Sequence, residues 1–97
     1  MEPISLILLL LAGGFAGAAI AQVTWDMVDN WIRSRALRGG YAEIISSRLA
    51  GGDYHVVAGI FSPYGVRTSM QTWDAQALDP ELARRLRTSG GVIRVRT

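Results

Sequence analysis

The chain has 97 residues, no cysteine and a net charge of +2 at pH 7. This length allows one small folded domain, and the lack of cysteine excludes disulfides, thiolate nucleophiles and cysteine-ligated metal sites. The basic residues are all arginine, which in a chain rich in Ala and Gly indicates a GC-rich bacterial genome. Because the arginines are spread out and no aromatic stacking motif accompanies them, the composition disfavours a nucleic-acid partner.

The first predicted element is a transmembrane helix over residues 1–24. No charged residue lies between Ile4 and Ala21, and residues 6–11 form a continuous aliphatic run. A helix of about 18 residues covers roughly 27 Å, which is just enough to cross a bilayer. The pattern therefore predicts a single-pass membrane protein whose apolar segment contacts membrane lipid.

The residues that follow this segment predict how it is oriented. Trp25 and Trp31 are expected at the headgroup level as interfacial aromatic residues. Arg33, Arg35 and Arg38 follow the span, whereas no basic residue precedes it. Since basic residues favour the cytoplasmic side of a membrane, the C-terminal domain is expected in the cytoplasm.

Two other interpretations of the N-terminal segment stay open. Ala19, Ile20 and Ala21 form an A-x-A site, so a signal peptide cleaved after Ala21 would give a secreted protein. Glu2 and the lack of an early basic residue argue against this interpretation. A buried helix within a soluble domain is the third possibility, because the span is near the minimum length.

Small residues recur at every fourth position of the apolar segment. Gly13, Gly17 and Ala21 share one face of the predicted helix, while Gly14 and Ala18 share a second. Such small-xxx-small stripes let two helices approach closely in lipid, so they predict a homo-oligomer. The same stripes also arise by chance in a chain this rich in Gly and Ala.

An amphipathic continuation is predicted over residues 25–40. Its apolar stripe consists of Val23, Met27 and Trp31, with Thr24, Val28 and Ile32 beside it. Because no helix-breaking residue intervenes outside the membrane, one helix is expected from Ile4 to Arg38. Gly39 and Gly40 end it.

Residues 41–97 are predicted to form a small α+β domain. Strands are expected at Tyr41–Leu49, Tyr54–Phe61, Val66–Trp73 and Val92–Arg96, from their β-branched and aromatic residues. Asp79 followed by Pro80 is a helix start, with Asp as the N-cap and Pro at the first helical position. The fold class is therefore α+β, a long N-terminal helix followed by an antiparallel β-β-β-α-β domain. So small a sheet is expected to need the long helix or a neighbouring subunit to complete its core.

No catalytic, cofactor or metal site is predicted. His55 is the single histidine and lacks a second histidine or a cysteine for a metal site, so an ordinary strand position is favoured. The glycine pairs lack the spacing of a phosphate loop, and we expect no enzyme. One basic cluster could bind an acidic protein partner; it contains Arg84, Arg85, Arg87, Arg94 and Arg96.

These features lead to three functional hypotheses. The first is a membrane-anchored structural or assembly subunit that self-associates through its small-residue helix face. The second is a small membrane-perturbing effector or pore former that uses the same face. The third is a membrane-tethered protein-binding module that recruits a partner through a sheet edge or the arginine cluster.

Overall fold

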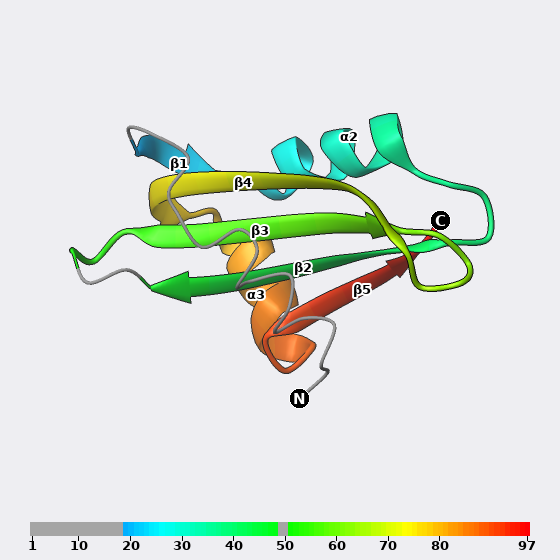
Figure 1. The fold of residues 1–97 in the computed structure, drawn as a ribbon. Coiled ribbons are helices and arrows are strands. Elements are labelled where there is room, and N and C mark those ends of the chain that lie inside the picture. The colour runs from blue at the N-terminus through cyan, green and yellow to red at the C-terminus, as the bar shows by residue number, and fades with distance from the viewer. Residues whose placement is uncertain (1–18, 49–50) are drawn as a thin grey trace.

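The computed structural model describes residues 19–48 and 51–97, which form one curled sheet and two helices (Figure 1). In chain order the elements are β1 (Ile20–Val23), α2 (Trp25–Arg35), β2 (Tyr41–Arg48), β3 (Tyr54–Phe61), β4 (Arg67–Leu78), α3 (Pro80–Thr88) and β5 (Val92–Arg96). The strands lie in the order β1-β4-β3-β2-β5. All neighbouring pairs are antiparallel except β1 and β4, which run parallel.

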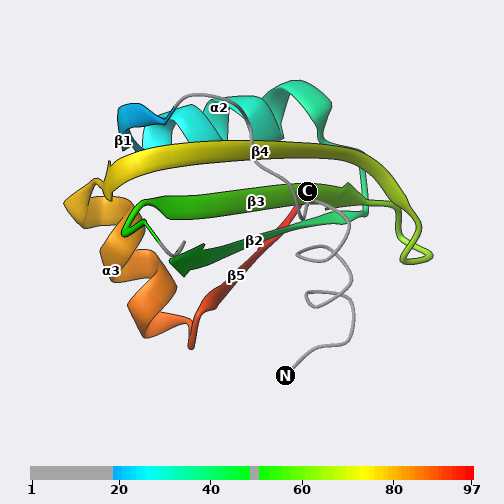
Figure 2. The ribbon, with the colours of Figure 1, turned by 60° about the vertical axis from the view of Figure 1, so that its left-hand side comes forward.

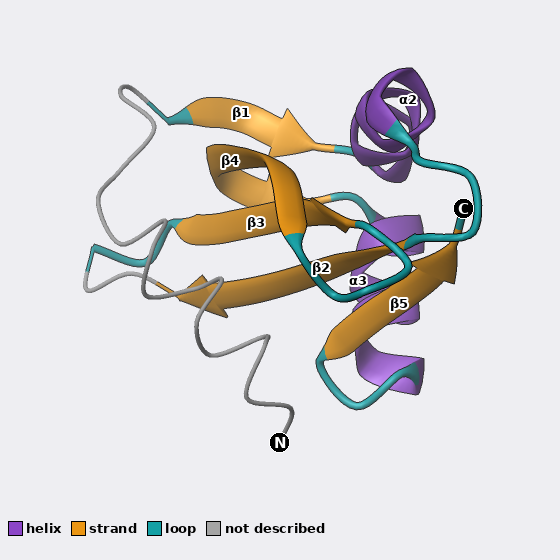
Figure 3. Ribbon diagram, turned by 45° about the vertical axis from the view of Figure 1, so that its right-hand side comes forward, coloured by secondary structure: helices purple, strands orange, loops and turns teal. Residues whose placement is uncertain are grey.

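Both helices pack on the same face of the sheet (Figures 2 and 3). Val28 and Ile32 of α2 and Leu82 and Leu86 of α3 belong to one buried apolar cluster. The sheet contributes Ala42, Ile44, Val56, Ala58, Ile60, Ala75 and Ile93 to this cluster. The main core therefore lies between this face and the two helices.

Alternate residues of each strand point to the opposite face, which we call the open face. Strand β3 illustrates the division, because Val56, Ala58 and Ile60 belong to the main core while Val57 belongs to a second, smaller cluster. That cluster joins Val57 to Ile45, with Met70 and Val92 packed against them. The sheet is therefore apolar on both faces.

The predicted long N-terminal helix is wrong where the structure describes it. Residues 20–23 form strand β1, in which Ile20 lies opposite Ala75 and Val23 opposite Leu78 of β4. A helix begins only at Trp25 and has 11 residues. The amphipathic stripe of the sequence is real, but it belongs to a short helix that packs on a sheet.

Three hydrogen bonds explain why the helix does not extend backwards. The Thr24 side chain accepts a bond of 3.1 Å from the Met27 amide and so caps α2. The Asp79 carboxylate accepts one of 3.1 Å from the Trp25 amide. The Asp79 amide in turn donates to the Val23 carbonyl at 3.0 Å. These groups fix residues 20–24 in an extended conformation that pairing with β4 stabilises further.

The predicted single-pass membrane protein with a cytoplasmic domain is also corrected. Among residues 19–48 and 51–97, no helix is long and apolar enough to cross a membrane. Ala21, after which cleavage was considered, lies within strand β1. Residues 1–18, which contain most of the predicted span, lie outside the described residues.

The C-terminal half has its elements close to the predicted ranges. Helix α3 begins at Pro80, and the Asp79 side chain accepts a hydrogen bond of 2.6 Å from the Leu82 amide, which confirms the predicted N-cap. Strand β4 differs, because it continues to Leu78 rather than ending at Trp73. Its last residues are the ones that pair with β1.

A glycine is required where the chain enters β2. A Cβ atom at Gly40 would overlap the carbonyl oxygen of Phe61 and lie 3.2 Å from its carbonyl carbon. Gly40 is buried, and its carbonyl accepts a hydrogen bond of 3.0 Å from the Thr97 amide. The backbones of β2, β3 and the segment after β5 therefore meet closely at this point.

We expect Gly40→Ala to lower the free energy of unfolding by about 1–3 kcal/mol, because backbone atoms must move to admit the methyl group. Gly51→Ala is the matched control, since nothing lies within 4 Å of a Cβ there, and we expect a change of at most about 0.5 kcal/mol. Urea denaturation of both variants measures the difference. Equal losses of stability in the two variants would contradict the close approach of the Phe61 carbonyl to Gly40.

Asp79→Ala should destabilise the fold by about 2 kcal/mol, because it removes the cap of α3 and the acceptor of the Trp25 amide together. Thr24→Ala removes only the cap of α2 and is expected to cost about 1 kcal/mol. Chemical denaturation gives both values. If Asp79→Ala loses no more stability than Thr24→Ala, the hydrogen bond from the Trp25 amide to Asp79 contributes nothing.

Candidate functional site

The open face carries a buried pair formed by His55 and Asp74. The two residues lie directly opposite each other on β3 and β4, and they are 2% and 5% exposed. Nδ1 of His55 is hydrogen-bonded to Oδ1 of Asp74. Within the described part of the chain, Nε2 of the same ring is buried and has no hydrogen-bond partner. The carboxylate therefore orients the imidazole and leaves one ring nitrogen unused.

An aspartate bonded to a histidine is an arrangement that general bases use, and such a base acts on a nucleophile within hydrogen-bond reach. Ser47 of β2 lies opposite His55 in the ladder. Its hydroxyl makes no bond to Nε2, because that atom has no partner. Nor does any group of three His, Cys, Asp or Glu residues within 19–48 and 51–97 form a metal site. The geometry thus provides an oriented imidazole without a connected nucleophile or metal.

A second polar pair, Glu43 with Arg94, lies farther along the open face. Glu43 is fully buried, and its Oε2 accepts hydrogen bonds from Nε of Arg94, at 3.0 Å, and from Nη2. The Arg94 guanidinium lies 5.6 Å from the ring centroid of Tyr41, which stacks on Phe61 at 5.0 Å. Two charge-assisted bonds offset the cost of burying this carboxylate, so the pair is well satisfied.

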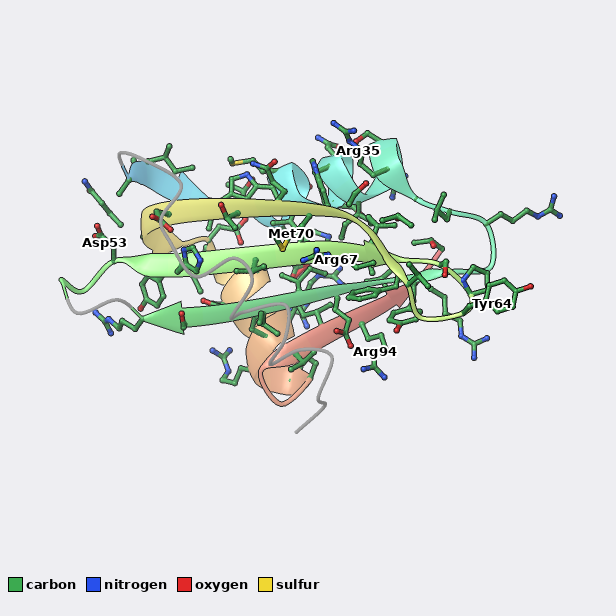
Figure 4. All side chains as sticks on the ribbon, viewed as in Figure 1. Arg35, Asp53, Tyr64, Arg67, Met70 and Arg94 are labelled. Atoms are coloured by element: carbon green, nitrogen blue, oxygen red, sulfur yellow. The ribbon has the colours of Figure 1, made fainter. Side chains whose placement is uncertain are left out.

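The two most exposed large apolar side chains of the described residues, Tyr64 and Val66, lie at one end of the sheet, where β3 turns into β4. We call this region the hairpin-end surface, and it comprises Leu37, Arg38, Tyr64, Val66, Arg67 and Arg96. Strand β2 begins and β5 ends beside the same turn, because Tyr41 lies opposite both Phe61 and Arg96. Figure 4 shows Tyr64 projecting from this end of the molecule.

An ordered turn presents Tyr64 to solvent. The Ser62 hydroxyl accepts hydrogen bonds of 3.2 Å from the amides of Tyr64 and Val66. The amide of Gly65, whose φ is +82°, donates to the Ser62 carbonyl at 2.9 Å. Tyr64 is nevertheless 92% exposed and Val66 61%. The hydrogen-bonded turn therefore keeps the large apolar side chains of Tyr64 and Val66 exposed to solvent.

The charge of this surface is positive. No carboxylate among residues 19–48 and 51–97 forms an ion pair with Arg38, Arg67 or Arg96. Arg67 donates to the Met70 sulfur at 3.5 Å, and both residues lie over the sheet in Figure 4. The arginines are therefore available to an acidic partner.

The predicted membrane-interface residues have other surroundings in the structure. Trp25 and Trp31 are partly buried against the main core, and Trp31 contacts Trp73 edge-on at 6.1 Å. Arg33 pairs with Asp29 at 2.9 Å on α2. Arg35 is exposed near the end of the same helix, and Arg38 lies on the hairpin-end surface.

The five arginines predicted to bind an acidic partner do not form one continuous patch. Arg84 and Arg85 of α3 lie within 2.5 and 3.6 Å of the Glu81 carboxylate, and Arg85 also covers the Trp25 ring at 4.3 Å. Arg87 is exposed on α3, behind the sheet. Arg94 and Arg96 project from β5 on the open-face side. Of this set, Arg96 alone belongs to the hairpin-end surface.

The residues predicted for helix self-association fall mostly outside the described part. Gly13, Gly14, Gly17 and Ala18 lie within residues 1–18. Ala21 is exposed in strand β1. The self-association prediction is therefore untested.

Sequence reasoning missed the His55–Asp74 pair and the hairpin-end surface. The third strand was expected to end at Trp73, which left Asp74 outside it. Continuing the alternation of β4 by one residue would have put Asp74 on the same face as His55. Tyr64 was not singled out, although a tyrosine and a valine beside arginines at a hairpin tip are a composition typical of interfaces.

Comparisons with protein-family models, curated proteins and solved structures found no match to this chain.

A double-mutant cycle tests the buried His55–Asp74 pair. We expect Asp74→Leu to lower the free energy of unfolding by about 3–5 kcal/mol, because it removes the partner of a buried polar ring. His55→Leu combined with Asp74→Leu should cost at least about 1 kcal/mol less than the sum of the single losses. Urea denaturation of the four proteins measures this coupling, and strictly additive losses would contradict it.

Proposed function

We propose that this protein is a small binding module that docks an acidic, apolar-anchored segment of a partner protein on the hairpin-end surface. The observation that carries the proposal is the exposure of Tyr64, 92%, on an ordered turn flanked by arginines. A water-exposed aromatic ring on a fixed backbone gains much by being buried in an interface.

The composition of the surface supports this proposal. Tyrosine and arginine are the residues that most often dominate the binding energy of protein interfaces. Arg38, Arg67 and Arg96 have no ion-pair partner among the described residues. Positive charge around an apolar centre would speed association with an acidic segment and disfavour basic ones.

The rigidity of the surface supports it as well. The turn around Tyr64 has its own hydrogen bonds, and Pro63 lies 3.4 Å from the position that a Cβ of Gly39 would occupy. The Thr97 hydroxyl donates to the Leu37 carbonyl at 2.7 Å. Because these loops are already ordered, binding would lose less conformational entropy than docking on a flexible tip.

Peptide selection against the full-length protein tests the proposal. Peptides selected from a random library of short segments are expected to be rich in Asp and Glu around one or two apolar residues. Fluorescence anisotropy then gives their affinity, which should weaken with added salt because exposed charges are screened. Selection of basic or uncharged peptides would contradict the proposed partner chemistry.

Variants locate the binding site of the selected peptides. Tyr64→Ala should weaken binding at least about tenfold, because it removes the central anchor. Arg67→Ser should weaken it by a smaller factor and reduce the salt dependence. Arg87→Ser is the matched control, since it removes the same charge from an exposed position on α3. If Arg67→Ser and Arg87→Ser weaken peptide binding equally, the arginines attract the peptide only through the net charge of the protein, and the proposal is overturned.

A further inference from the structure

Strand β5 forms one edge of the sheet (Figure 1). Its residues lie opposite Tyr41–Ile45 of β2, and none of the strands within 19–48 and 51–97 pairs with its other side. An edge strand carries a row of backbone N–H and C=O groups that the ladder to its one neighbour does not use. Such a row is the surface on which an extended segment of another protein can add a strand.

One hydrogen bond shows which residues of β5 carry this row. The Thr97 amide donates to the Gly40 carbonyl at 3.0 Å, and these two residues continue the register of β2 and β5 by one position. In an antiparallel ladder, hydrogen-bonded pairs alternate with pairs that are not hydrogen-bonded. The residues that direct their backbone groups to the outer side of β5 are therefore Val92, Arg94 and Arg96.

The side chains of β5 determine which strand suits this edge. Ile93 and Val95 pack on the main core, while Arg94 and Arg96 lie on the open-face side and are exposed. Arg94 bonds Glu43, so the charge that the edge offers to a partner comes from Arg96. Strand β5 contains no acidic residue. An added strand is therefore favoured when it has acidic side chains on the arginine side and apolar side chains on the other.

A second copy of the chain does not meet this requirement. Antiparallel pairing of two β5 strands over their whole length would place Arg94 directly opposite Arg94 of the other copy. Like charges that lie directly opposite each other destabilise a strand pair, and charged residues on edge strands commonly prevent self-pairing. The edge therefore favours an acidic strand over a copy of itself.

We propose that the acidic partner segment binds as an added strand along the outer edge of β5. The edge is continuous with the hairpin-end surface, because Arg96 belongs to both and lies opposite Tyr41, which in turn lies opposite Phe61 just before the turn of Tyr64. This inference rests on the proposed function and adds the way in which the segment is held. Main-chain hydrogen bonds hold the segment, and acidic residues at alternate positions face Arg96.

Amide hydrogen exchange of the full-length ¹⁵N-labelled protein tests the added strand directly. The probe is a synthetic peptide of alternating glutamate and valine with blocked ends, and the control peptide has the same composition with all its glutamates first. In the free protein, the amides of Val92 and Arg96 are expected to exchange faster than that of Ile93, which faces β2. The alternating peptide should slow the exchange of Val92 and Arg96 at least about tenfold, and the control peptide should not.

Three results of this experiment would overturn the proposal. Slow exchange of Val92 and Arg96 in the free protein would show that the edge is already paired. Unchanged exchange in the presence of the alternating peptide would show that no strand is added. Equal slowing by the two peptides would show that the alternation of acidic and apolar residues has no role.

Two variants at one position separate the backbone from the charge. Arg96→Ser removes the charge and keeps the outward N–H, whereas Arg96→Pro removes both. Proline is tolerated in an edge strand where the N–H faces solvent, so the ladder to β2 should persist, as circular dichroism will check. Arg96→Pro should bind the alternating peptide at least about tenfold more weakly than Arg96→Ser, because the strand loses a main-chain bond and meets the proline ring. Equal affinities of the two folded variants would contradict strand addition.

Peptides selected from the random library distinguish this inference from the proposed function. If they lose affinity in Tyr64→Ala but bind Arg96→Pro and Arg96→Ser equally, the hairpin-end surface is the binding site and the added strand is wrong. If Tyr64→Ala leaves their affinity unchanged while the alternating peptide still slows Val92 and Arg96, the edge of β5 binds by itself and the proposed function is wrong.

Discussion

The fold depends on one carboxylate that joins three elements. Both oxygens of Asp79 accept backbone hydrogen bonds, one from Leu82 at the start of α3 and one from Trp25 at the start of α2. Its own amide bonds the carbonyl of Val23 at the end of β1. The positive ends of two helix dipoles thus meet at one negative charge. Because both helices begin at this point, both cross the same face of the sheet.

That division gives the two faces different chemistry. The buried cluster on the helix-covered face is aliphatic and aromatic, so it needs no polar partners. The open face combines an apolar strip with two buried polar pairs, and each carboxylate there bonds a cation or an imidazole on a neighbouring strand. Such pairs add little net stability, yet breaking one is costly. They therefore fix which strands lie side by side, since a shift in register would separate the partners.

The sequence predicted local structure better than long-range contacts. The strand at Tyr54–Phe61 and the start of α3 at Asp79 show as patterns of residues that are close together in the sequence, and both predictions were right. The pairing of β1 with β4 joins Ile20 to Ala75, and no local pattern shows it. Apolar spacing alone did not separate a long helix from a strand followed by a short helix. Thr24 was the available signal, because a threonine two residues before Asp26 is a common helix start.

The same distribution of burial bears on what the protein can do. The side chains with chemistry suited to acid–base work, His55 and Asp74, are nearly inaccessible, and Glu43 is fully so. Reacting groups must meet their substrate, whereas structural pairs need only each other. The most exposed large apolar side chains of the described residues are Tyr64 and Val66, which lie beside arginines at the hairpin end. Exposed apolar groups on a bonded turn are costly unless a partner covers them. Covering these exposed groups would release free energy on association, which supports the binding role proposed above.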